Sequence, residues 1–205
     1  MVIDILNFRV EQKAYNIAGV EVDGNLGENP TVMIGSIFYK GDKTVRDEKT
    51  GSFNRERAEE MISKVEEISD RTGLPAMLDV VCSNPENARN YLEFAADVTS
   101  MPILIDAVSL EAALTGLESA KELGVVERTI FNSINPETKQ QIYMKIREVG
   151  LDSAIGADFI LYGPIKAAEH IFPAISLIDA SYGQLLMEEG KRLNPNHPRF
   201  KIAHL

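Results

Sequence analysis

The stretch AMLDVVCSNPENARNYLEFAADVTSMPILIDAV, residues 76–108, decides the fold class of this chain. Two short apolar runs, 76–82 and 102–108, flank a segment that opens with Asn84-Pro85-Glu86. A capping residue, a proline in the first turn and an acidic residue at the positive end of the helix dipole are typical of a helix start. Continuous apolar runs of this length are typical of strands buried in a parallel sheet. The stretch therefore predicts a strand, a crossover helix and a second strand.

The same unit recurs on both sides of this stretch. The predicted strands are 31–39, 76–82, 102–108 and 128–133, and the helices that follow them begin after Asn54, Asn84, Ser109 and Asn135. Each of these four residues is an Asn or Ser, a type that caps helix N-termini, and Gly73 ends the first helix. Regular alternation of strand and helix predicts right-handed crossovers and a parallel sheet.

The alternation breaks at Ile155-Gly156. A weak predicted strand over 151–155 is followed at once by another over 156–163, which leaves no room for the crossover that parallel strands require. We count at most six strands, whereas a (β/α)8 barrel takes eight strands and roughly 250 residues. The predicted fold class is α/β, and about two βα units of such a barrel are missing near Ile155-Gly156.

The ends of the chain extend this single predicted domain, which covers residues 1–205. KAYNIAGVEVDG, residues 13–24, predicts an N-terminal hairpin that turns at Gly19. The region after Pro164 is predicted to be helical with a break at Pro173, and about 191–205 is predicted to be an extended tail.

Composition and charge exclude several classes of partner. The 205 residues are 44% apolar, which is enough for one sizeable core, and a net charge of −10 without a basic run excludes nucleic acid as an expected partner. The N-terminus lacks a signal-peptide pattern, and no apolar stretch reaches the roughly 18 residues of a membrane span. We therefore expect a cytoplasmic protein.

Cysteine and histidine are too sparse for a metal site. Cys82 is the only cysteine, and without a suitably placed histidine we interpret it as a small buried residue rather than a nucleophile. His170, His197 and His204 match no metal-ligand spacing, so we assign no metal. The glycines form no phosphate-binding loop.

Four polar residues at the carboxyl ends of predicted strands are the candidate site, because ligands of parallel α/β folds bind there. They are Asp79, Asp106, Asn132 and Ser133. A carboxylate in an apolar run must find hydrogen-bond donors in the protein or in a ligand. The amide of Asn132 offers both a donor and an acceptor without carrying charge.

Each main candidate has a structural alternative. Asp106 could cap the following helix or pair with a neighbour, Asp79 could pair with a basic residue on a covering helix, and Asn132 could simply begin a turn. The loop over 40–54 is longer than most βα connections, which suggests a lid or a partner surface, and a solvated loop is the alternative.

Four segments together resemble one protein family. They are NPTVMIGSIFYKGDKTVRDEKTGSF (29–53), LDVVCSNPENARNYLEFAADVTSMPILIDAVS (78–109), RTIFNSINPE (128–137) and GADFILYGPIKAAEHIFPAISLIDA (156–180). They resemble the H subunit of the tetrahydromethanopterin S-methyltransferases, a family with bacterial relatives that methylate tetrahydrofolate. The family is similar to the wider class of pterin-binding methyltransferases, and the resemblance implies their (β/α)8 barrel.

The resemblance also implies a reaction and its residues. A methyl group moves between N5 of a tetrahydropterin, either tetrahydrofolate or tetrahydromethanopterin, and a corrinoid (cobalamin) carried by a partner protein. Asp106 of LIDAVS would hold the pterin ring, and Asn132 of IFNSIN would lie beside N5 as the catalytic residue. Asp79 and Ser133 would be further pterin contacts. Two departures from the family are Asp42, where a histidine is expected, and the short junction at Ile155-Gly156.

For partners, we expect a corrinoid protein, a homodimer and a peripheral position on a membrane methyltransferase complex. Two other functions stay open from the sequence. One is a non-catalytic pterin-binding or docking subunit, and the other is an unrelated α/β-barrel enzyme acting on a small carboxylate or phosphate ester.

Overall fold

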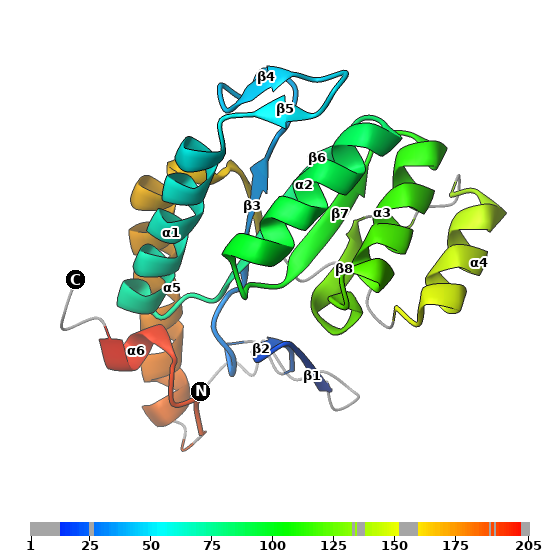
Figure 1. The fold of residues 1–205 in the computed structure, drawn as a ribbon. Helices are drawn as coiled ribbons and strands as arrows, with labels where there is room; N and C mark the ends of the chain where they lie inside the picture. The colour runs from blue at the N-terminus through cyan, green and yellow to red at the C-terminus, as the bar shows by residue number, and fades with distance from the viewer. Residues whose placement is uncertain are drawn as a thin grey trace.

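The computed structural model describes residues 13–24, 27–132, 134, 138–151, 160–188, 190 and 192–201. Its centre is a parallel sheet with the strand order β8-β7-β6-β3-β9 (Figure 1). The strands are β3 (Met33–Ile37), β6 (Ala76–Cys82), β7 (Ile103–Ala107), β8 (Thr129–Asn132) and β9 (Ile160–Pro164). Four of them lie within the four strands predicted before the junction, so the parallel α/β class is confirmed.

The fifth strand, β9, pairs with β3 at the edge opposite β8. It lies at the end of the predicted strand over 156–163, whereas all but the first residue of the predicted strand over 151–155 is outside the described residues. Within the described residues β8 and β9 form the two edges of the sheet and do not pair with each other. The (β/α)8 barrel therefore stays a prediction.

Helices that follow the first four parallel strands along the chain cover one face of the sheet (Figure 1). They are α1 (Arg55–Thr72), α2 (Pro85–Val98), α3 (Leu110–Glu122) and α4 (Gln140–Val149). The predicted caps Asn54, Asn84 and Ser109 each accept a hydrogen bond from a backbone N–H in the first turn of their helix. Local capping chemistry thus fixes where α1, α2 and α3 begin.

The start of α4 differs from the prediction. The helix begins at Gln140 after Lys139, which provides no side-chain cap, and the predicted cap Asn135 lies outside the described residues. The short helix η1 (Val126–Arg128) precedes β8.

The predicted break at Pro173 is wrong. After the short helix η2 (Ile165–Ala167), helix α5 runs over Ala168–Glu188 and contains Pro173. Pro173 lies near the start of the helix, where its missing N–H removes one backbone hydrogen bond and the remaining turns continue. Helix α5 packs beside α1, and its Asp179 carboxylate accepts hydrogen bonds from the backbone N–H and the hydroxyl of Thr31, just before β3.

The predicted extended tail contains a short helix, α6 (Pro198–Lys201). Pro198 is well suited to the first helical position, and Nδ1 of His197 accepts a hydrogen bond from the backbone N–H of Arg199. The ammonium of Lys201 donates to the carbonyl of Asp70 at 3.0 Å, which ties the helix to α1. The prediction of a wholly extended tail is therefore wrong.

Two hairpins flank the sheet at opposite ends (Figure 1). The residues predicted to form the N-terminal hairpin lie in β1 (Ala14–Ile17) and β2 (Val20–Asp23), which pair antiparallel around Gly19. In the long loop over 40–54, β4 (Val45–Asp47) pairs antiparallel with β5 (Ser52–Phe53).

The hairpin β4–β5 is fastened to α2. The side-chain amides of Asn84 and Asn87 donate to the carbonyl of Glu48 at 2.9 and 3.2 Å, and that of Asn90 donates to the carbonyl of Thr50. Phe53 packs edge-on against aromatic rings of the core. These contacts favour a fixed cover for the start of α2 over a mobile lid.

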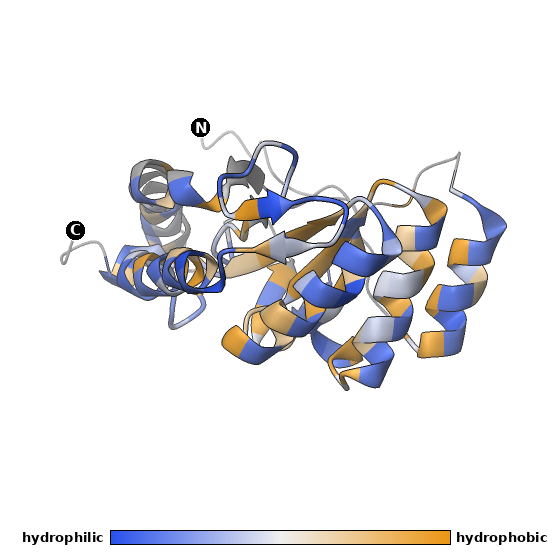
Figure 2. Ribbon diagram, turned by 45° about the horizontal axis from the view of Figure 1, so that its top comes forward, coloured by the Kyte–Doolittle hydropathy of each residue, from blue (hydrophilic) through white to orange (hydrophobic). Residues whose placement is uncertain are grey.

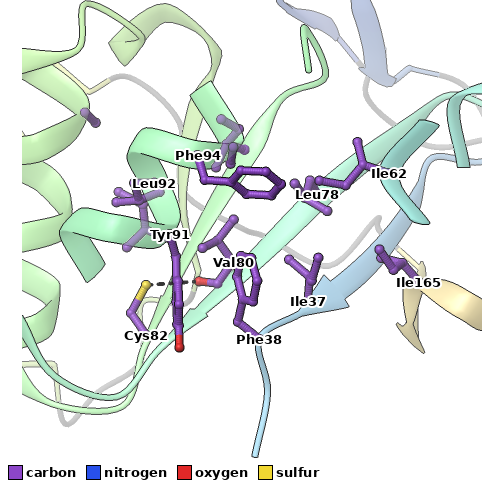
Figure 3. Close-up of a cluster of buried hydrophobic side chains, with 14 of the residues drawn as sticks. Ile37, Phe38, Ile62, Leu78, Val80, Cys82, Tyr91, Leu92, Phe94 and Ile165 are labelled. Atoms are coloured by element: carbon purple, nitrogen blue, oxygen red, sulfur yellow. Dashed lines mark hydrogen bonds between the residues drawn. The ribbon is translucent and has the colours of Figure 1, made fainter. Parts of the chain in front are cut away.

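Asp42, the departure from the family pattern, supports the start of this loop. Its carboxylate is buried and accepts hydrogen bonds from the backbone N–H groups of Phe38 and Thr44 at 2.8 and 2.9 Å. Phe38 has a φ of 64°, a conformation that a bulky residue adopts only when its surroundings hold it there. Its ring stacks on Tyr91 with centroids 4.1 Å apart (Figure 3).

The sheet separates two apolar clusters. The larger lies between the sheet and the helices and includes Ile37, Leu78, Val80 and Phe94 (Figure 3). The smaller lies on the opposite face of the sheet, called here the inner face, and includes Ile17 and Val22 of the N-terminal hairpin. Figure 2 shows the orange apolar strands behind helices that alternate blue and orange.

The turn of hairpin β4–β5 provides a stability test. Gly51 has a φ of 66°, and an added Cβ would lie 2.8 Å from Cα of Asn87, whereas Gly41 has a φ of 85° with nothing within 4 Å of such a Cβ. Gly41→Ala should lower the free energy of unfolding by about 1 kcal/mol, and Gly51→Ala by about 1 to 3 kcal/mol more. Urea denaturation of both variants measures the difference. Equal losses would show that the hairpin is not held against α2.

Candidate functional site

Strand geometry builds the site in two layers on the inner face. Successive side chains of a strand point to opposite faces, so residues two apart share a face. The first layer is apolar and holds one buried residue from each of four neighbouring strands, namely Ile34, Met77, Leu104 and Ile130. Two residues further along the same strands, the second layer is polar and consists of Ser36, Asp79, Asp106 and Asn132.

Strand register places the polar residues at two heights. Ser36 is the Cα partner of Asp79, and Asp106 is the Cα partner of Asn132, but Asp79 lies level with Leu104. Because Asp106 follows Leu104 by two residues, Asp106 and Asn132 lie two residues nearer the carboxyl end of the sheet than Ser36 and Asp79. This difference explains why Asp79 is only 1% exposed, whereas Asp106 and Asn132 are half-buried.

Asp79 is the centre of a hydrogen-bonded chain that joins three strands. The hydroxyl of Ser36 donates to Oδ2 of Asp79 at 2.6 Å, and Nδ2 of Asn132 donates to Oδ1 at 3.0 Å. Burial raises the pKa of Asp79, and the two hydrogen bonds oppose that rise. Each carboxylate oxygen thus has one donor within the protein.

Asp106, unlike Asp79, has no hydrogen bond or ion pair to its carboxylate within the described ranges. Burial first, and then the nearby charge of Asp79, raises the pKa of Asp106 to about 6. A half-buried carboxylate without donors is ready to accept N–H groups from a ligand. The arrangement can therefore bind a polar, planar heterocycle that presents N–H groups to the strand ends.

Three of the four predicted site residues come together. Asp79, Asp106 and Asn132 lie in the polar layer, while Ser133 is outside the described residues. The alternative partner for Asp79, a basic residue on a covering helix, is not what the structure contains, because Ser36 and Asn132 bind it.

The structure also does not support Asp106 as a helix cap or Asn132 as only a turn residue. The cap of α3 is Ser109 and not Asp106. Asn132 does more than begin a turn, because its amide reaches across β7 to Asp79.

Sequence reasoning missed Ser36. Ser36 points to the same face of β3 as Ile34, two positions earlier. A polar residue two positions after an apolar residue of the inner face was therefore the feature that could have identified it. The continuous apolar run around it hid this signal, because such a run does not reveal which residues face the ligand side.

Other titratable groups offer no second centre within the described residues. The thiol of Cys82 is fully buried in the larger apolar cluster, and burial raises its pKa far above the ordinary value. The described residues include no group of three or more side chains that could together hold a metal ion. None of the described helices has the length and apolar character needed to cross a bilayer.

A groove of about 650 Å³ has a lining that does not include the polar layer. It lies between α1, the start of α5 and the loop after β3, and its walls include Met61, Lys64 and Ile165. Acidic and basic side chains alternate around it, and none of the predicted site residues lines it.

Comparison with known proteins gives one family. The profile of the tetrahydromethanopterin S-methyltransferase MtrH subunit matches residues 10–156 and, separately, residues 148–193. The two matches meet at the junction where the alternation of strands and helices breaks.

Individual relatives carry the same description. The tetrahydromethanopterin S-methyltransferase H subunit of Methanopyrus kandleri is 40% identical over 158 residues, which cover 77% of this chain and 48% of the relative. The corresponding protein of Methanothermobacter thermautotrophicus is 39% identical over 155 residues, covering 76% and 50%. That of Methanocaldococcus jannaschii is 38% identical over 151 residues, covering 74% and 47%. The chain spans about half the length of the relatives it matches.

The raised pKa of Asp106 predicts a pH-dependent cost to stability. Between the unfolded pKa of about 3.9 and the folded pKa of about 6, the folded chain binds more protons, so its stability falls as pH rises through this window. Asp106→Asn removes the titration, and at pH 7.5 it should be more stable than the parent by on the order of 1 kcal/mol after allowance for solvent screening. Urea denaturation should show this advantage shrinking toward pH 4. A difference that is constant from pH 4 to 8 would contradict the assignment.

Proposed function

The chain belongs to the tetrahydromethanopterin S-methyltransferase MtrH subunit family, and from this we propose that it moves a methyl group between N5 of a tetrahydropterin and a corrinoid carried by a partner protein. The observation that carries the proposal is the polar layer at the strand ends, in which no donor among the described residues reaches Asp106 and Asn132 is held by Asp79. The names of the relatives favour tetrahydromethanopterin over tetrahydrofolate.

Asp106 suits the binding role. A reduced pterin presents ring and exocyclic N–H groups along one edge, and a carboxylate accepts two such donors side by side. The half-buried position weakens competition from water, so each contact is stronger than at an open surface. Ligand N–H groups would also remove part of the cost of holding this carboxylate ionised.

Asn132 suits the chemical step. An amine is a poor leaving group, so breaking the methyl bond to N5 needs a hydrogen bond or a proton at that nitrogen as negative charge develops there. One N–H of the Asn132 amide donates to Asp79, and the second, which donates to no other described residue, would bind the ligand. A donor held in this way stabilises the departing nitrogen more than the bound substrate.

The corrinoid supplies a strongly nucleophilic cobalt that accepts the methyl group. The residues of this chain hold the pterin, orient the methyl bond toward the open carboxyl ends of the strands and exclude water. The corrinoid protein, the homodimer, the cytoplasmic location and the peripheral place on a membrane complex stay predictions.

The second candidate is a non-catalytic pterin-binding or docking subunit. It is favoured by the two edges of the sheet, β8 and β9, which do not pair with each other within the described part of the chain. Binding of a methylated tetrahydropterin without turnover by any corrinoid protein would support it. Family membership leaves no reason to propose the unrelated α/β-barrel enzyme.

Asp106→Ala should weaken pterin binding strongly. Loss of a charge-assisted contact costs roughly 1.5 to 3 kcal/mol, which corresponds to a rise in Kd of about 10- to 150-fold. Isothermal titration calorimetry with tetrahydromethanopterin and with tetrahydrofolate measures the change and identifies the preferred pterin. Unchanged affinity in a folded variant would refute the role of Asp106.

Asn132→Ala should lower kcat and largely spare binding. If the hydrogen bond to N5 strengthens only as the methyl group leaves, kcat falls by a factor on the order of 10² while Kd for the pterin changes within a few-fold. Stopped-flow methyl transfer at saturating pterin measures this effect. A folded, saturated variant that reacts at the parent rate would place catalysis elsewhere.

A further inference from the structure

Ser36 belongs to the site although it is too low in the sheet to meet a ligand directly. It lies level with Asp79, two residues further from the carboxyl end of the sheet than Asp106 and Asn132, and it is 9% exposed. Its hydroxyl donates to Oδ2 of Asp79 at 2.6 Å. Asp79 is itself 1% exposed and accepts the amide of Asn132 on its other oxygen. Three side chains from β3, β6 and β8 therefore form one continuous chain of hydrogen bonds.

The orientation of the Asn132 amide depends on the ionisation of Asp79. An ionised carboxylate only accepts hydrogen bonds, so it must face the NH2 end of the amide. A protonated carboxyl group has a donor, and it could face the carbonyl end after the amide turns over. The two orientations present different groups to a ligand beside Asn132.

The hydroxyl of Ser36 favours the ionised form. It donates to Oδ2 of the buried Asp79, and a donor to the charged form of a carboxyl group stabilises that form. Burial acts in the opposite direction on the pKa of Asp79. Removing the hydroxyl leaves burial opposed only by the amide of Asn132.

We propose that Ser36 is a positioning residue that acts through Asp79 to fix the amide orientation of Asn132. The link to catalysis rests on the proposed function, whereas the link from Ser36 to the amide does not. The hydroxyl is needed and the rest of the side chain is not, so threonine should replace serine and alanine should not.

Two titratable groups lie near Asp79 and must be separated from it. Asp106 on β7 and the thiol of Cys82 on β6 both interact with its charge, while no basic side chain of the described residues forms an ion pair with it. Asp106 titrates in the accessible pH range, so the direct test uses an Asp106→Asn background.

The test follows the side-chain NH2 signals of Asn132 by ¹⁵N NMR from pH 4 to 9 in the ligand-free chain, with the signals assigned by their loss in Asn132→Asp. Ser36→Ala should raise the midpoint of their pH-dependent shift by roughly one to two pH units, and Ser36→Thr should keep the starting value. The same midpoint in Ser36→Ala and Ser36→Thr would overturn the proposal.

A further variant keeps the test decisive if Ser36→Ala fails to fold. With Asp79→Asn in the same Asp106→Asn background, the titration of the Asn132 signals should disappear. If it persists, the amide reports another group and the proposal is wrong.

Methyl transfer provides the functional half of the test, with Asp106 in place. The rate ratio of parent to Ser36→Ala should grow as pH falls, because the variant loses the ionised form of Asp79 first, and Ser36→Thr should follow the parent. A ratio that stays the same at every pH would mean a purely structural role and overturn the positioning role. If the native chain transfers no methyl group, the proposed function fails, and the NMR result still decides the link from Ser36 to Asn132.

Discussion

The strict alternation of side chains along parallel strands is the constraint on which the site depends. It puts Ile34, Met77, Leu104 and Ile130 in one apolar layer, which the N-terminal hairpin covers. The same alternation puts the polar residues two positions later on the same face. Because each polar residue follows an apolar one by two positions, the packing that seals the apolar residues also fixes where the polar residues lie along each strand.

Asp79 carries the main electrostatic cost of this arrangement. A carboxylate with 1% exposure is tolerable only because both oxygens have donors, and those donors come from strands on either side. Burial, and after it the charge of Asp79, raises the pKa of Asp106, which has no donor within the described ranges. The ionised Asp106 carboxylate thus lowers the free energy of unfolding, and ligand N–H groups that bind it would recover part of this loss. Such local destabilisation is common at functional sites.

Most of the fold could be predicted from local sequence. The strand β6 coincides with its predicted run, and Asn54, Asn84 and Ser109 cap their helices, because apolar runs and capping residues act over a few neighbouring positions. The prediction of an extended tail failed because a contact distant in sequence determines the structure there: helix α6 is tied to α1 through Lys201. Hairpin β4–β5 also depends on a distant element, since its carbonyls accept hydrogen bonds from the side-chain amides of Asn87 and Asn90 of α2.

The candidate site was predictable in part for the same reason. Strand ends located Asp79, Asp106 and Asn132, but strand register decides which of them is buried beneath the others, and register is not encoded in any one strand. Asp79 has a protein partner on each oxygen, and its contact with a ligand stays a prediction.

If the proposed function is right, a tetrahydropterin binds at the carboxyl ends of β7 and β8. A crystal structure of the chain with a methylated tetrahydropterin would decide this. The ring N–H groups should contact the Asp106 carboxylate, with N5 beside the Asn132 amide. A pterin bound instead in the groove between α1 and α5, with Asp106 and Asn132 untouched, would refute the proposed site.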